Sequence, residues 1–391
     1  MKIGIDASFL RKQNTGIGQV TINFLKKLME VTNSKIQTSN DGKMEFFIYL
    51  EEDVDFEFPE NFHKRIFLPF WKRDDILRAV LWQKHCLPKK AAADGCEVFL
   101  SLFQCTTILP KKIKHIMVVH DVILEFFPEY LSNWRKKYFW TLSKKAIASV
   151  DKIVAVSHRT EKDLIQKLKI APEKITVAHV DVDEIYKKTV SEIQSKKVLA
   201  KYGLEAGYLY NGGGLEVRKN TEGVLRAYKM LLEKAENQEK IPKLVISGKM
   251  MPQLKPLVVD VEEIVEELEL KDKVELLGFV RQHDLPALYH AASIFLYPSK
   301  YEGFGLPILE AMNQGVPTIT SKKSSLPEIG SDGVLYCDPD NVEDLFMVMR
   351  NLLRNEKLQE ALSEKAKVRA KRFSMEKFAS KILHIAENIK N

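Results

Sequence analysis

Two glutamates, Glu302 and Glu310, lie on either side of a glycine turn in the segment YPSKYEGFGLPILE, residues 297–310. A strand-like run precedes the turn, and Pro307 suits the first turn of a helix. Because amides at a helix start attract phosphate, we expect those of Gly303–Leu306 to bind a diphosphate. The carboxylates would repel it, so both glutamates should face hydroxyl groups beside it. This arrangement fits a nucleotide sugar.

Taken singly, Glu302 could be a solvated loop charge and Glu310 could lie on an exposed helix face. The whole pattern, two glutamates with seven residues between them within EGFGLPxLEA, resembles the retaining glycosyltransferases of the GT-B fold, glycosyltransferase family 4 (group 1). The resemblance implies an α/β protein with two Rossmann-like, doubly wound domains facing a central cleft. It also implies transfer of a hexose from a nucleotide-diphosphate sugar to a hydroxyl group with retained anomeric configuration, without a bound metal or other cofactor.

A second glycine loop, Asn211–Gly214, is followed by the cations Arg218 and Lys219. An Arg fork and a compact Lys charge can together stabilise the charge that develops on a departing diphosphate. A solvated basic pair on a surface turn is the alternative. Members of the family carry RKN here, and the resemblance implies that Arg218 and Lys219 contact the donor diphosphate.

Three weaker motifs follow strands in the first half of the chain. The first is TGIG, residues 15–18, which lacks the rest of a dinucleotide fingerprint and resembles a family loop near the donor phosphate and the acceptor. The second is His120-Asp121, where the family places a histidine beside the transferred sugar. The third begins at Ser157, a predicted helix N-cap, and contributes Arg159 as a basic residue reaching toward the donor. A lone His-Asp pair and a lone cap are also common structural features.

The resemblance assigns roles to fifteen residues. The catalytic group is His120, Asp121, Arg218, Lys219 and Glu302. The donor-binding group is Gly16, Gly18, Arg159, Gly213, Gly248, Gly303, Phe304, Gly305, Leu306 and Glu310. Within this scheme Glu302 and the following amides position the sugar, and Glu310 holds the ribose. The segments GVPT and SSLPEIG, residues 315–318 and 324–330, are most similar to bacterial mannosyl- and rhamnosyltransferases of surface-polysaccharide synthesis, which favours mannose and GDP-mannose as donor.

Alternating short apolar runs and helical patterns in both halves predict parallel sheets covered by helices. We expect an N-terminal acceptor domain over residues 1–185 and a C-terminal donor domain over 186–374, joined through a polar stretch at about 182–200. A final helix, about 375–391, should pack back on the first domain. Strands are expected at residues 2–6, 46–50, 98–100, 115–120 and 152–156, then at 208–211, 243–247, 274–277, 294–297, 317–320 and 333–336.

Length and composition fit a folded protein of two domains, with 391 residues, 45% hydrophobic and 29% charged. The start of the chain lacks the pattern of a signal peptide, and no apolar run is long enough for a transmembrane helix. The four cysteines have neither metal-ligand nor CxxC spacing, which indicates free thiols and no metal site. We therefore expect a cytoplasmic protein.

The net charge of +7 is concentrated between residues 64 and 152, which hold 17 Lys and Arg against 8 Asp and Glu. Cations alternate with aromatic residues there, including Trp71, Trp82, Trp134 and Trp140, as on proteins that dock on anionic membranes. A solvated helix face with buried aromatics is an equal alternative. The membrane interpretation implies a lipid-linked acceptor at the inner leaflet.

Two other functional classes stay open. One is a different GT-B enzyme, such as a sugar-nucleotide epimerase or a phosphorylase. The other is a non-catalytic protein, either a sugar-nucleotide sensor or a nucleic-acid binder that uses the basic half. The paired glutamates and the Arg-Lys pair argue against a sensor. The sequence holds no nucleic-acid-binding motif, so nucleic acid is not an expected partner.

Overall fold

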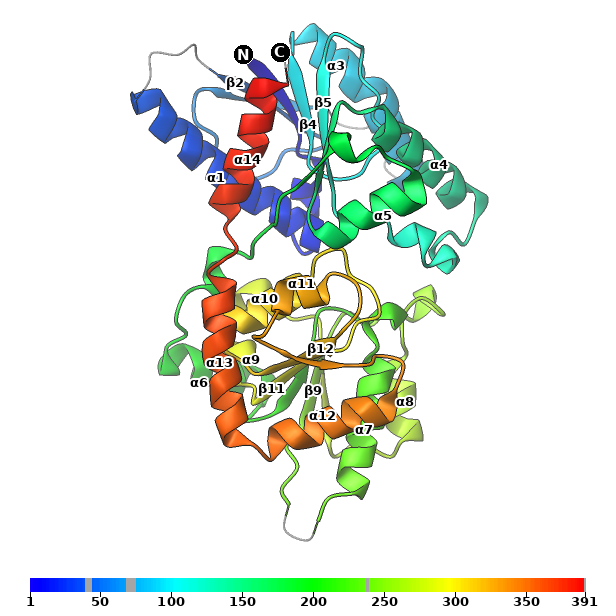
Figure 1. Cartoon of the computed structure of the whole chain (residues 1–391), viewed down its shortest axis with the longest axis vertical. Coiled ribbons are helices and arrows are strands. Elements are labelled where there is room, and N and C mark those ends of the chain that lie inside the picture. Colours follow the sequence, from blue (N-terminus) through cyan, green and yellow to red (C-terminus); the bar gives the residue numbers. More distant parts are fainter. Residues whose placement is uncertain (39–43, 68–74, 237–238, 390–391) are drawn as a thin grey trace. The chain divides into compact units, whose positions relative to one another are not determined.

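The computed structural model describes residues 1–38, 44–67, 75–236 and 239–389. The chain divides into two compact units (Figure 1). The first unit is Met1–Asp181 together with Ser374–Asn391, and the second unit is Val182–Phe373. The division therefore falls four residues before the boundary expected after residue 185, and the last helix groups with the first unit.

The first unit is built on a parallel sheet of seven strands in the order β3-β2-β1-β4-β5-β6-β7. The strands are β1 (Lys2–Asp6), β2 (Glu45–Leu50), β3 (Phe62–Ile66), β4 (Val98–Ser101), β5 (Lys114–Val119), β6 (Lys152–Ala155) and β7 (Ile175–Val177). The central strands are almost entirely buried, as expected for a sheet covered on both faces.

The helices of the first unit follow these strands. They are α1 (Gly16–Thr38), α2 (Asp75–Leu81), α3 (Leu87–Ala93), α4 (Trp134–Ser149), α5 (His158–Leu168) and α14 (Met375–Asn388). A π-helical turn, η2 (Trp82–Cys86), joins α2 to α3. Helix α14 lies beside α1 (Figure 1), and the rings of Phe24 and Phe378 meet edge to face with centroids 5.9 Å apart.

The second unit is built on a parallel sheet of six strands in the order β10-β9-β8-β11-β12-β13. The strands are β8 (Leu209–Asn211), β9 (Leu244–Ser247), β10 (Val274–Gly278), β11 (Ile294–Tyr297), β12 (Thr318–Ser321) and β13 (Leu335–Cys337). The helices are α6 (Glu192–Tyr202), α7 (Thr221–Glu233), α8 (Val261–Glu267), α9 (Leu285–Ala291), α10 (Leu306–Asn313), α11 (Leu326–Gly330), α12 (Val342–Leu353) and α13 (Glu356–Ala370).

Both sheets reverse their strand order once, between β1 and β4 in the first unit and between β8 and β11 in the second. Such reversals mark a doubly wound fold, as expected from the sequence. Ligands of these folds bind outside the carboxyl ends of the strands at the reversal point. The loops that leave β1, β4, β8 and β11 are therefore the first places to look for a site.

Three elements differ from the sequence-based expectation. Strands β3 and β7 were not expected. They lie at the two edges of the same sheet. β3 reads FHKRI with only Phe62 buried, and β7 is three residues long with only Ile175 buried, so neither shows the buried run of a central strand. No helix was singled out within the polar connection expected at about 182–200, and α6 begins at Glu192 inside it. The hydroxyl of Ser191 caps α6, and only Val198 and Leu199 are buried along it, which explains its weak periodicity.

Candidate active site

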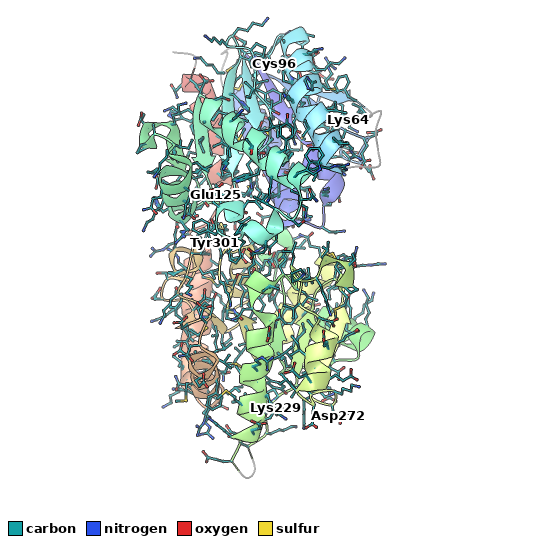
Figure 2. All side chains as sticks on the ribbon, turned by 90° about the vertical axis from the view of Figure 1, so that its right-hand side faces the viewer. Lys64, Cys96, Glu125, Lys229, Asp272 and Tyr301 are labelled. Atoms are coloured by element: carbon teal, nitrogen blue, oxygen red, sulfur yellow. The ribbon has the colours of Figure 1, made fainter. Side chains whose placement is uncertain are left out.

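The loops after β8 and β11 bring Arg218, Lys219 and Glu302 together in the second unit. The loop after β8 passes through glycines 212–214 into a short 3-10 helix, η7 (Val217–Lys219). The loop after β11 carries Glu302 and leads into α10. Tyr301 lies at one end of this unit, whereas Lys229 and Asp272 lie at the opposite end (Figure 2). Three residues predicted to be catalytic thus converge at the reversal point of the sheet.

Arg218 is fixed by the loop that carries Glu302. Its Nη1 atom donates to Glu302 Oε1 at 2.6 Å and to the carbonyl oxygen of Tyr301 at 2.9 Å. Its Nη2 atom lies 3.4 Å from Glu216 Oε2. The side chains of Arg218 and Glu302 are only 14% and 12% exposed, so neither is a solvated surface charge.

Lys219 is held on the other side of the same carboxylate. Its Nζ atom donates to the Tyr297 hydroxyl at 2.9 Å and lies 3.7 Å from Glu302 Oε1. The Tyr297 hydroxyl donates to Glu302 Oε1 at 2.7 Å, and Ser299 Oγ donates to the same atom at 2.9 Å. Two cations and two hydroxyls therefore surround one carboxylate oxygen.

This environment keeps Glu302 ionised. Burial alone would raise the pKa of the carboxyl, but the charges of Arg218 and Lys219, aided by the hydroxyls of Tyr297 and Ser299, lower it to about 2. Charge-assisted hydrogen bonds of this kind are stronger than neutral ones. The cations are consequently preorganised at a fixed position between Glu302 and the more exposed Glu216, whose Oε2 atom lies 3.4 Å from Arg218 Nη2 and 3.6 Å from Lys219 Nζ.

The glycine turn after Glu302 opens α10 as predicted. Gly305 occupies the N-cap position with φ +116°, a conformation that side-chain-bearing residues rarely adopt, and Pro307 lies in the first turn of the helix. Ser325 Oγ donates to the carbonyl oxygens of Glu302 and Phe304 at 2.9 and 2.7 Å, and Ser324 Oγ accepts from the Glu302 amide at 3.1 Å. The two serines that follow β12 therefore fix the turn.

Glu310 lies in a different environment from Glu302. The Tyr289 hydroxyl donates to Glu310 Oε2 at 2.9 Å, and Tyr186 is a second hydrogen-bonding partner. Burial raises the pKa of Glu310 to about 7, and the two phenols and the charge of Lys219 only partly oppose that shift. The two glutamates of the motif are thus pushed to opposite pKa extremes, which commonly separates their roles.

Gly213 and Gly248, both predicted to bind the donor, lie in loops that leave β8 and β9. A Cβ atom on Gly213 would come within 2.9 Å of the Tyr297 ring, and one on Gly248 within 2.6 Å of Leu215. The backbone at Gly213 and Gly248 therefore packs closely against Tyr297 and Leu215, respectively. These contacts explain the glycines structurally and leave their donor role a prediction.

In the first unit, His120 and Asp121 follow β5 at the same end of the sheet as the loops after β1 and β4. His120 Nε2 lies 2.9 Å from the carbonyl oxygen of Leu102, so Nε2 carries the proton that it donates. Burial lowers the pKa of His120, which favours the neutral ring. Asp121 Oδ1 accepts from the Ile123 amide at 3.1 Å. Each side chain thus also has a structural partner.

The remaining predicted residues of the first unit lie at helix starts. Helix α1 begins at Gly16, and a Cβ atom on Gly18 would come within 2.1 Å of the Lys12 carbonyl oxygen, so only glycine fits there. Ser157 caps α5 as predicted, accepting from the Thr160 amide at 3.0 Å. Arg159 Nε donates to Asp163 Oδ2 at 2.8 Å. A structural ion pair therefore accounts for part of the Arg159 side chain.

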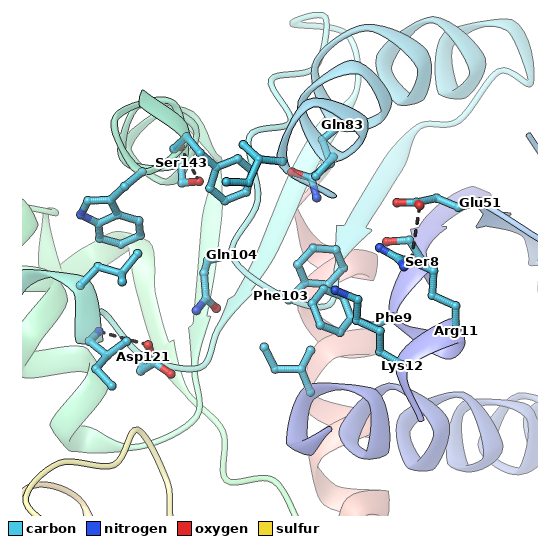
Figure 3. Close-up of a pocket in the computed structure, with 17 residues that line it drawn as sticks. Ser8, Phe9, Arg11, Lys12, Glu51, Gln83, Phe103, Gln104, Asp121 and Ser143 are labelled. Carbon is cyan, nitrogen blue, oxygen red and sulfur yellow. Dashed lines mark hydrogen bonds and ion pairs between the residues drawn. The ribbon is translucent and has the colours of Figure 1, made fainter. Parts of the chain in front are cut away.

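A cavity of about 430 Å³ lies at the reversal point of the first sheet (Figure 3). The loop after β1, the loop after β4, α2 and α4 supply most of its wall. Its lining is Ser8, Phe9, Arg11, Lys12, Ile17, Glu51, Ile76, Ala79, Gln83, Phe103, Gln104, Asp121, Ile123, Leu124, Phe139, Trp140 and Ser143. Of the predicted site residues, only Asp121 is among them. The site residues were predicted from sequence motifs, and wall residues such as Phe9 and Phe103 belong to no such motif.

The basic and aromatic residues of the first half separate into two groups. Trp82 and Trp140 are buried, which for these two residues agrees with the alternative that the aromatic side chains point into the core. Trp134 and Tyr138 are 71% and 50% exposed on α4. Trp71, with its neighbours Lys72 and Arg73, lies outside the described residues.

Two further observations concern metals and membranes. Within the described ranges, no group of three or more His, Cys, Asp or Glu side chains is placed to hold a metal ion. None of the helices in the part of the chain that the structure describes has the length and apolar character needed to cross a bilayer.

The sequence did not single out four residues that support the two glutamates. Tyr297 and Ser299 hold Glu302, while Tyr186 and Tyr289 hold Glu310. Tyr297 and Ser299 lie within the same motif and could have been found from their place at the end of β11. Tyr186 lies more than a hundred residues away from Glu310, and its contact depends on the tertiary fold.

Comparison with known proteins identifies the class to which this fold and site belong. A family model described as glycosyl transferases group 1 matches residues 196–369, and one described as Glycosyltransferase Family 4 matches residues 45–184. The O-antigen chain mannosyltransferase B of Escherichia coli is 33% identical over 271 residues, which are 68% of this chain and 69% of the relative. The chain therefore belongs to glycosyltransferase family 4 (group 1), and it is an enzyme of the hexosyltransferase class.

Two more comparisons extend over nearly the full chain. The O-antigen chain mannosyltransferase RfbU of Salmonella typhimurium is 27% identical over 367 residues, 92% of each chain. The crystal structure of WaaG, a glycosyltransferase involved in lipopolysaccharide biosynthesis, matches with a TM-score of 0.73 and 16% identity, covering 98% of this chain and 99% of the other. At that identity the structural match shows the fold alone, and the fold is GT-B.

Proposed function

We propose that this enzyme transfers a mannosyl residue from GDP-mannose to a saccharide or lipid-linked acceptor and retains the anomeric configuration. The observation that carries the proposal is the cluster of Arg218, Lys219 and Glu302 at the carboxyl ends of β8 and β11. Mannose is favoured because the two relatives described above are mannosyltransferases of O-antigen chains. The proposal of GDP as the donor nucleotide rests on the similarity of residues 315–330 to the bacterial mannosyl- and rhamnosyltransferases of the family.

In this proposal the donor diphosphate takes the place of Glu302 as the main partner of Arg218 and Lys219. Both cations already lie at the end of the loop, so little reorganisation is needed to stabilise the leaving diphosphate. The start of α10 supplies backbone amides for the same charge. Glu302, relieved of part of its ion pairing, can accept hydrogen bonds from hydroxyls of the sugar, and Glu310 accepts them from the ribose.

The acceptor belongs to the first unit in this proposal. Its hydroxyl attacks the anomeric carbon from the face that the diphosphate leaves, and the departing phosphate oxygen takes the hydroxyl proton. The anomeric carbon–oxygen bond to phosphate breaks as the new glycosidic bond forms. This scheme needs neither a carboxylate nucleophile nor a metal, because side-chain cations and helix amides balance the developing charge.

The donor is tested by thermal shift with GDP-mannose, GDP-fucose, UDP-glucose, UDP-galactose and dTDP-rhamnose. We expect stabilisation by GDP-mannose that is lost in Arg218→Ala and Glu310→Ala. Lys229→Ala is the matched control, because Lys229 lies at the far end of the unit (Figure 2) and should leave the response unchanged. Transfer is then followed with mannose-terminated acceptors, and NMR of the product gives its anomeric configuration.

Other outcomes identify the competing functions. Selective stabilisation by another nucleotide sugar would mean that this sugar, and not mannose, is the one transferred. An inverted product would contradict the retaining mechanism. Phosphate-dependent cleavage or an epimerised sugar nucleotide would indicate a phosphorylase or an epimerase. Donor binding without turnover on any acceptor or water would indicate a binding protein.

We also propose that α4 docks this enzyme on the anionic face of a membrane, where a lipid-linked acceptor is accessible. Helix α4 contains five Lys and Arg and no acidic residue. One stripe of the helix exposes Trp134, Lys137, Tyr138 and Lys145. Aromatic rings beside cations are typical of interfacial helices, and each cation near an anionic bilayer contributes roughly 1 kcal/mol.

Vesicle sedimentation tests this docking. We expect binding to vesicles that contain 30% phosphatidylglycerol, weak binding to pure phosphatidylcholine, and loss of binding in the double variant Lys137→Glu, Lys145→Glu. Lys162→Glu on α5 changes an exposed lysine of the same unit and should have no effect. Equal binding by the double variant, or equal binding to neutral vesicles, would contradict the docking surface.

A further inference from the structure

One oxygen of Glu302 carries the contacts that hold this carboxylate. Arg218, Tyr297 and Ser299 donate to Oε1, and Lys219 Nζ lies 3.7 Å from the same atom. The other oxygen, Oε2, accepts a hydrogen bond from none of the described residues and is not enclosed by them. The carboxylate therefore has one anchored oxygen and one that is available to a ligand.

The partners of Oε1 do not all stay with it in the proposed donor complex. There the diphosphate becomes the main partner of Arg218 and Lys219, because phosphate oxygens attract both cations. Glu302 then keeps its position only if another donor holds Oε1. The two remaining donors are the hydroxyls of Tyr297 and Ser299.

The Ser299 hydroxyl has one proton and three acceptors around it. Its Oγ atom lies 2.9 Å from Glu302 Oε1. The carbonyl oxygens of Arg218 and Tyr301 lie 3.2 and 3.3 Å from the same Oγ atom. A hydroxyl has a single proton to donate, so the two carbonyl oxygens compete with Glu302 for it. Ser299 is thus the weaker anchor of the two.

The Tyr297 hydroxyl has a single acceptor among the described residues. It donates to Glu302 Oε1 at 2.7 Å and accepts from Lys219 Nζ at 2.9 Å. Burial, together with the negative charge of Glu302, raises the pKa of the phenol well above its ordinary value. The phenol therefore keeps its proton and remains a donor to Glu302.

The ring of Tyr297 is also fixed in place. It is fully buried and stacks on the ring of Phe295, with centroids 5.8 Å apart and planes 14° apart. Gly213 lies against the ring edge, where a Cβ atom would come within 2.9 Å of it. Thr320 Oγ1 donates to the Tyr297 carbonyl oxygen at 2.8 Å. Strand β11 and its neighbours thus hold the phenol at Glu302 whether or not Lys219 moves.

We propose that Tyr297 is a positioning residue whose hydroxyl holds Glu302 Oε1 when the diphosphate draws Arg218 and Lys219 away, so that Oε2 faces a hydroxyl of the sugar. The inference rests on the proposed function and deepens it, because it names the group that orients Glu302 in the donor complex. The phenol then serves the sugar half of the donor. A phenol that instead held Lys219 for the diphosphate would serve the other half.

Isothermal titration of the full chain with GDP-mannose and with GDP separates these two roles. Tyr297→Phe keeps the ring and removes the hydroxyl. We expect this variant to weaken GDP-mannose binding by about tenfold or more, as loss of a hydrogen bond to a charged group implies, and to leave GDP binding unchanged. Tyr228→Phe is the matched control, because Tyr228 on α7 is equally buried and its hydroxyl donates to the Pro242 carbonyl oxygen at 2.8 Å.

A cycle of variants gives a second measurement. Glu302→Gln alone should weaken GDP-mannose relative to GDP. Adding Tyr297→Phe to Glu302→Gln should weaken it no further, because a positioning residue acts through the group that it positions. Losses that add in full would show that the phenol acts independently of Glu302 and would overturn the proposal.

Two results with Tyr297→Phe alone would also overturn it. Equal weakening of GDP-mannose and GDP would assign the phenol to Lys219 and the diphosphate. Unchanged affinity for both would show that Glu302 is held without the phenol. Circular dichroism and the melting temperature of each variant establish that the comparison is made on folded protein.

The panel of nucleotide sugars described above keeps this inference separate from the proposed function. If the wild type selects another donor, such as UDP-glucose, the proposal of GDP-mannose fails, and Tyr297→Phe is titrated with UDP-glucose and UDP instead. A loss confined to the nucleotide sugar would still support the role of Tyr297. If the wild type binds no donor of the panel, both proposals fail.

Discussion

At the scale of single residues, the fixed geometry of Arg218 predicts that its guanidinium is required and a lysine is not equivalent. One Nη atom bonds both Glu302 and the Tyr301 carbonyl, and a lysine ammonium cannot reproduce the planar fork. We expect Arg218→Lys to lower kcat for donor turnover by roughly 10²–10³-fold, with a smaller change in KM. Steady-state kinetics across donor concentrations check this.

Lys229→Arg is the matched control for that substitution, since it exchanges the same two side chains on α7 away from the loop. If Arg218→Lys retained kcat and changed only KM, Arg218 would bind donor and transition state equally and would not stabilise the leaving group.

The raised pKa of Glu310 predicts that this residue destabilises the free enzyme above neutral pH. Its pKa is about 7 in the folded protein, against an ordinary value of 4.5. The folded state therefore binds this proton more tightly, and stability falls as pH rises from about 4.5 through 7. Glu310→Gln should raise the free energy of unfolding at pH 8 by an amount on the order of 3 kcal/mol, and change it little at pH 5.

Urea unfolding at the two pH values measures this effect, and loss of GDP-mannose binding should accompany it because glutamine is a weaker acceptor for ribose hydroxyls. An equal gain at pH 5 and pH 8 would show that the stabilisation has another cause than ionisation.

The lowered pKa of Glu302 predicts a pH dependence of stability opposite to that of Glu310. Its folded pKa of about 2 lies below the ordinary 4.5, so its contribution to stability is present above pH 4.5 and is lost as pH falls toward 2. Glu302→Gln removes the more buried of the two carboxylates beside Arg218 and Lys219 and leaves only Glu216, and breaking a buried pair costs up to roughly 3–5 kcal/mol. We expect a lower melting temperature at pH 7 and a shrinking difference from wild type below pH 4.5.

Melting curves of wild type and Glu302→Gln between pH 3 and pH 8 provide the measurement. A deficit that persists unchanged down to pH 3 would mean that the carboxylate stabilises through its shape and hydrogen bonds and not through its charge.

The residues that could be predicted at this scale are those that lie in recognisable loop motifs at one edge of a sheet. Glu302, Arg218 and Lys219 came from two short loops, and parallel topology brings such loops to one edge of a sheet. The raised pKa of Glu310 could not be predicted, because it comes from burial in the folded protein, which the hydroxyls of Tyr186 and Tyr289 only partly oppose. The cavity residues were also out of reach, since apolar side chains that line a cavity resemble ordinary core residues in sequence.

At the scale of elements, the start of α10 predicts a specific effect of glycine replacement. Gly305 has φ +116°, and a Cβ atom there would lie 2.9 Å from Leu326. Gly305→Ala should cost at least about 1–2 kcal/mol of stability from backbone strain and should also weaken GDP-mannose binding, because the turn carries Glu302 and the amides of α10.

Gly203→Ala supplies the control for backbone strain alone. Gly203 ends α6 with φ +66° and has open space around it. The Gly203→Ala variant should lose about as much stability as Gly305→Ala and keep its donor affinity. Chemical unfolding and GDP-mannose titration measure the two quantities. Normal donor affinity in Gly305→Ala would remove the start of α10 from the proposed donor site.

Elements were predictable where burial imposes a pattern. The central strands are buried on both faces and appear in sequence as apolar runs, so β1, β4, β5 and β11 lie within a residue or two of their expected bounds. Edge strands β3 and β7 and the surface helix α6 bury few residues and therefore lack such a signal. The sequence pattern thus locates the strands that carry the site better than it locates the periphery.

At the scale of the whole molecule, the first unit is completed by the last helix of the chain. Helix α14 buries Met375, Phe378, Ile382 and Leu383, and Lys381 Nζ donates to the Val177 carbonyl at 2.6 Å. Phe378→Ala should cost about 3–5 kcal/mol through the cavity it leaves beside Phe24. Hydrogen exchange should then accelerate in α1 and β1 while α7 and α12 keep their protection.

Phe346→Ala on α12 is the reciprocal control, because Phe346 is buried in the core of the second unit. It should accelerate exchange in α7 and leave α1 protected. Two variants with opposite exchange patterns would establish that each unit has its own core and that residues 374–391 stabilise the first unit alone. Uniform acceleration across both units in either variant would instead mean that the two cores unfold as one cooperative body, and a ligand bound to one unit would then stabilise the other.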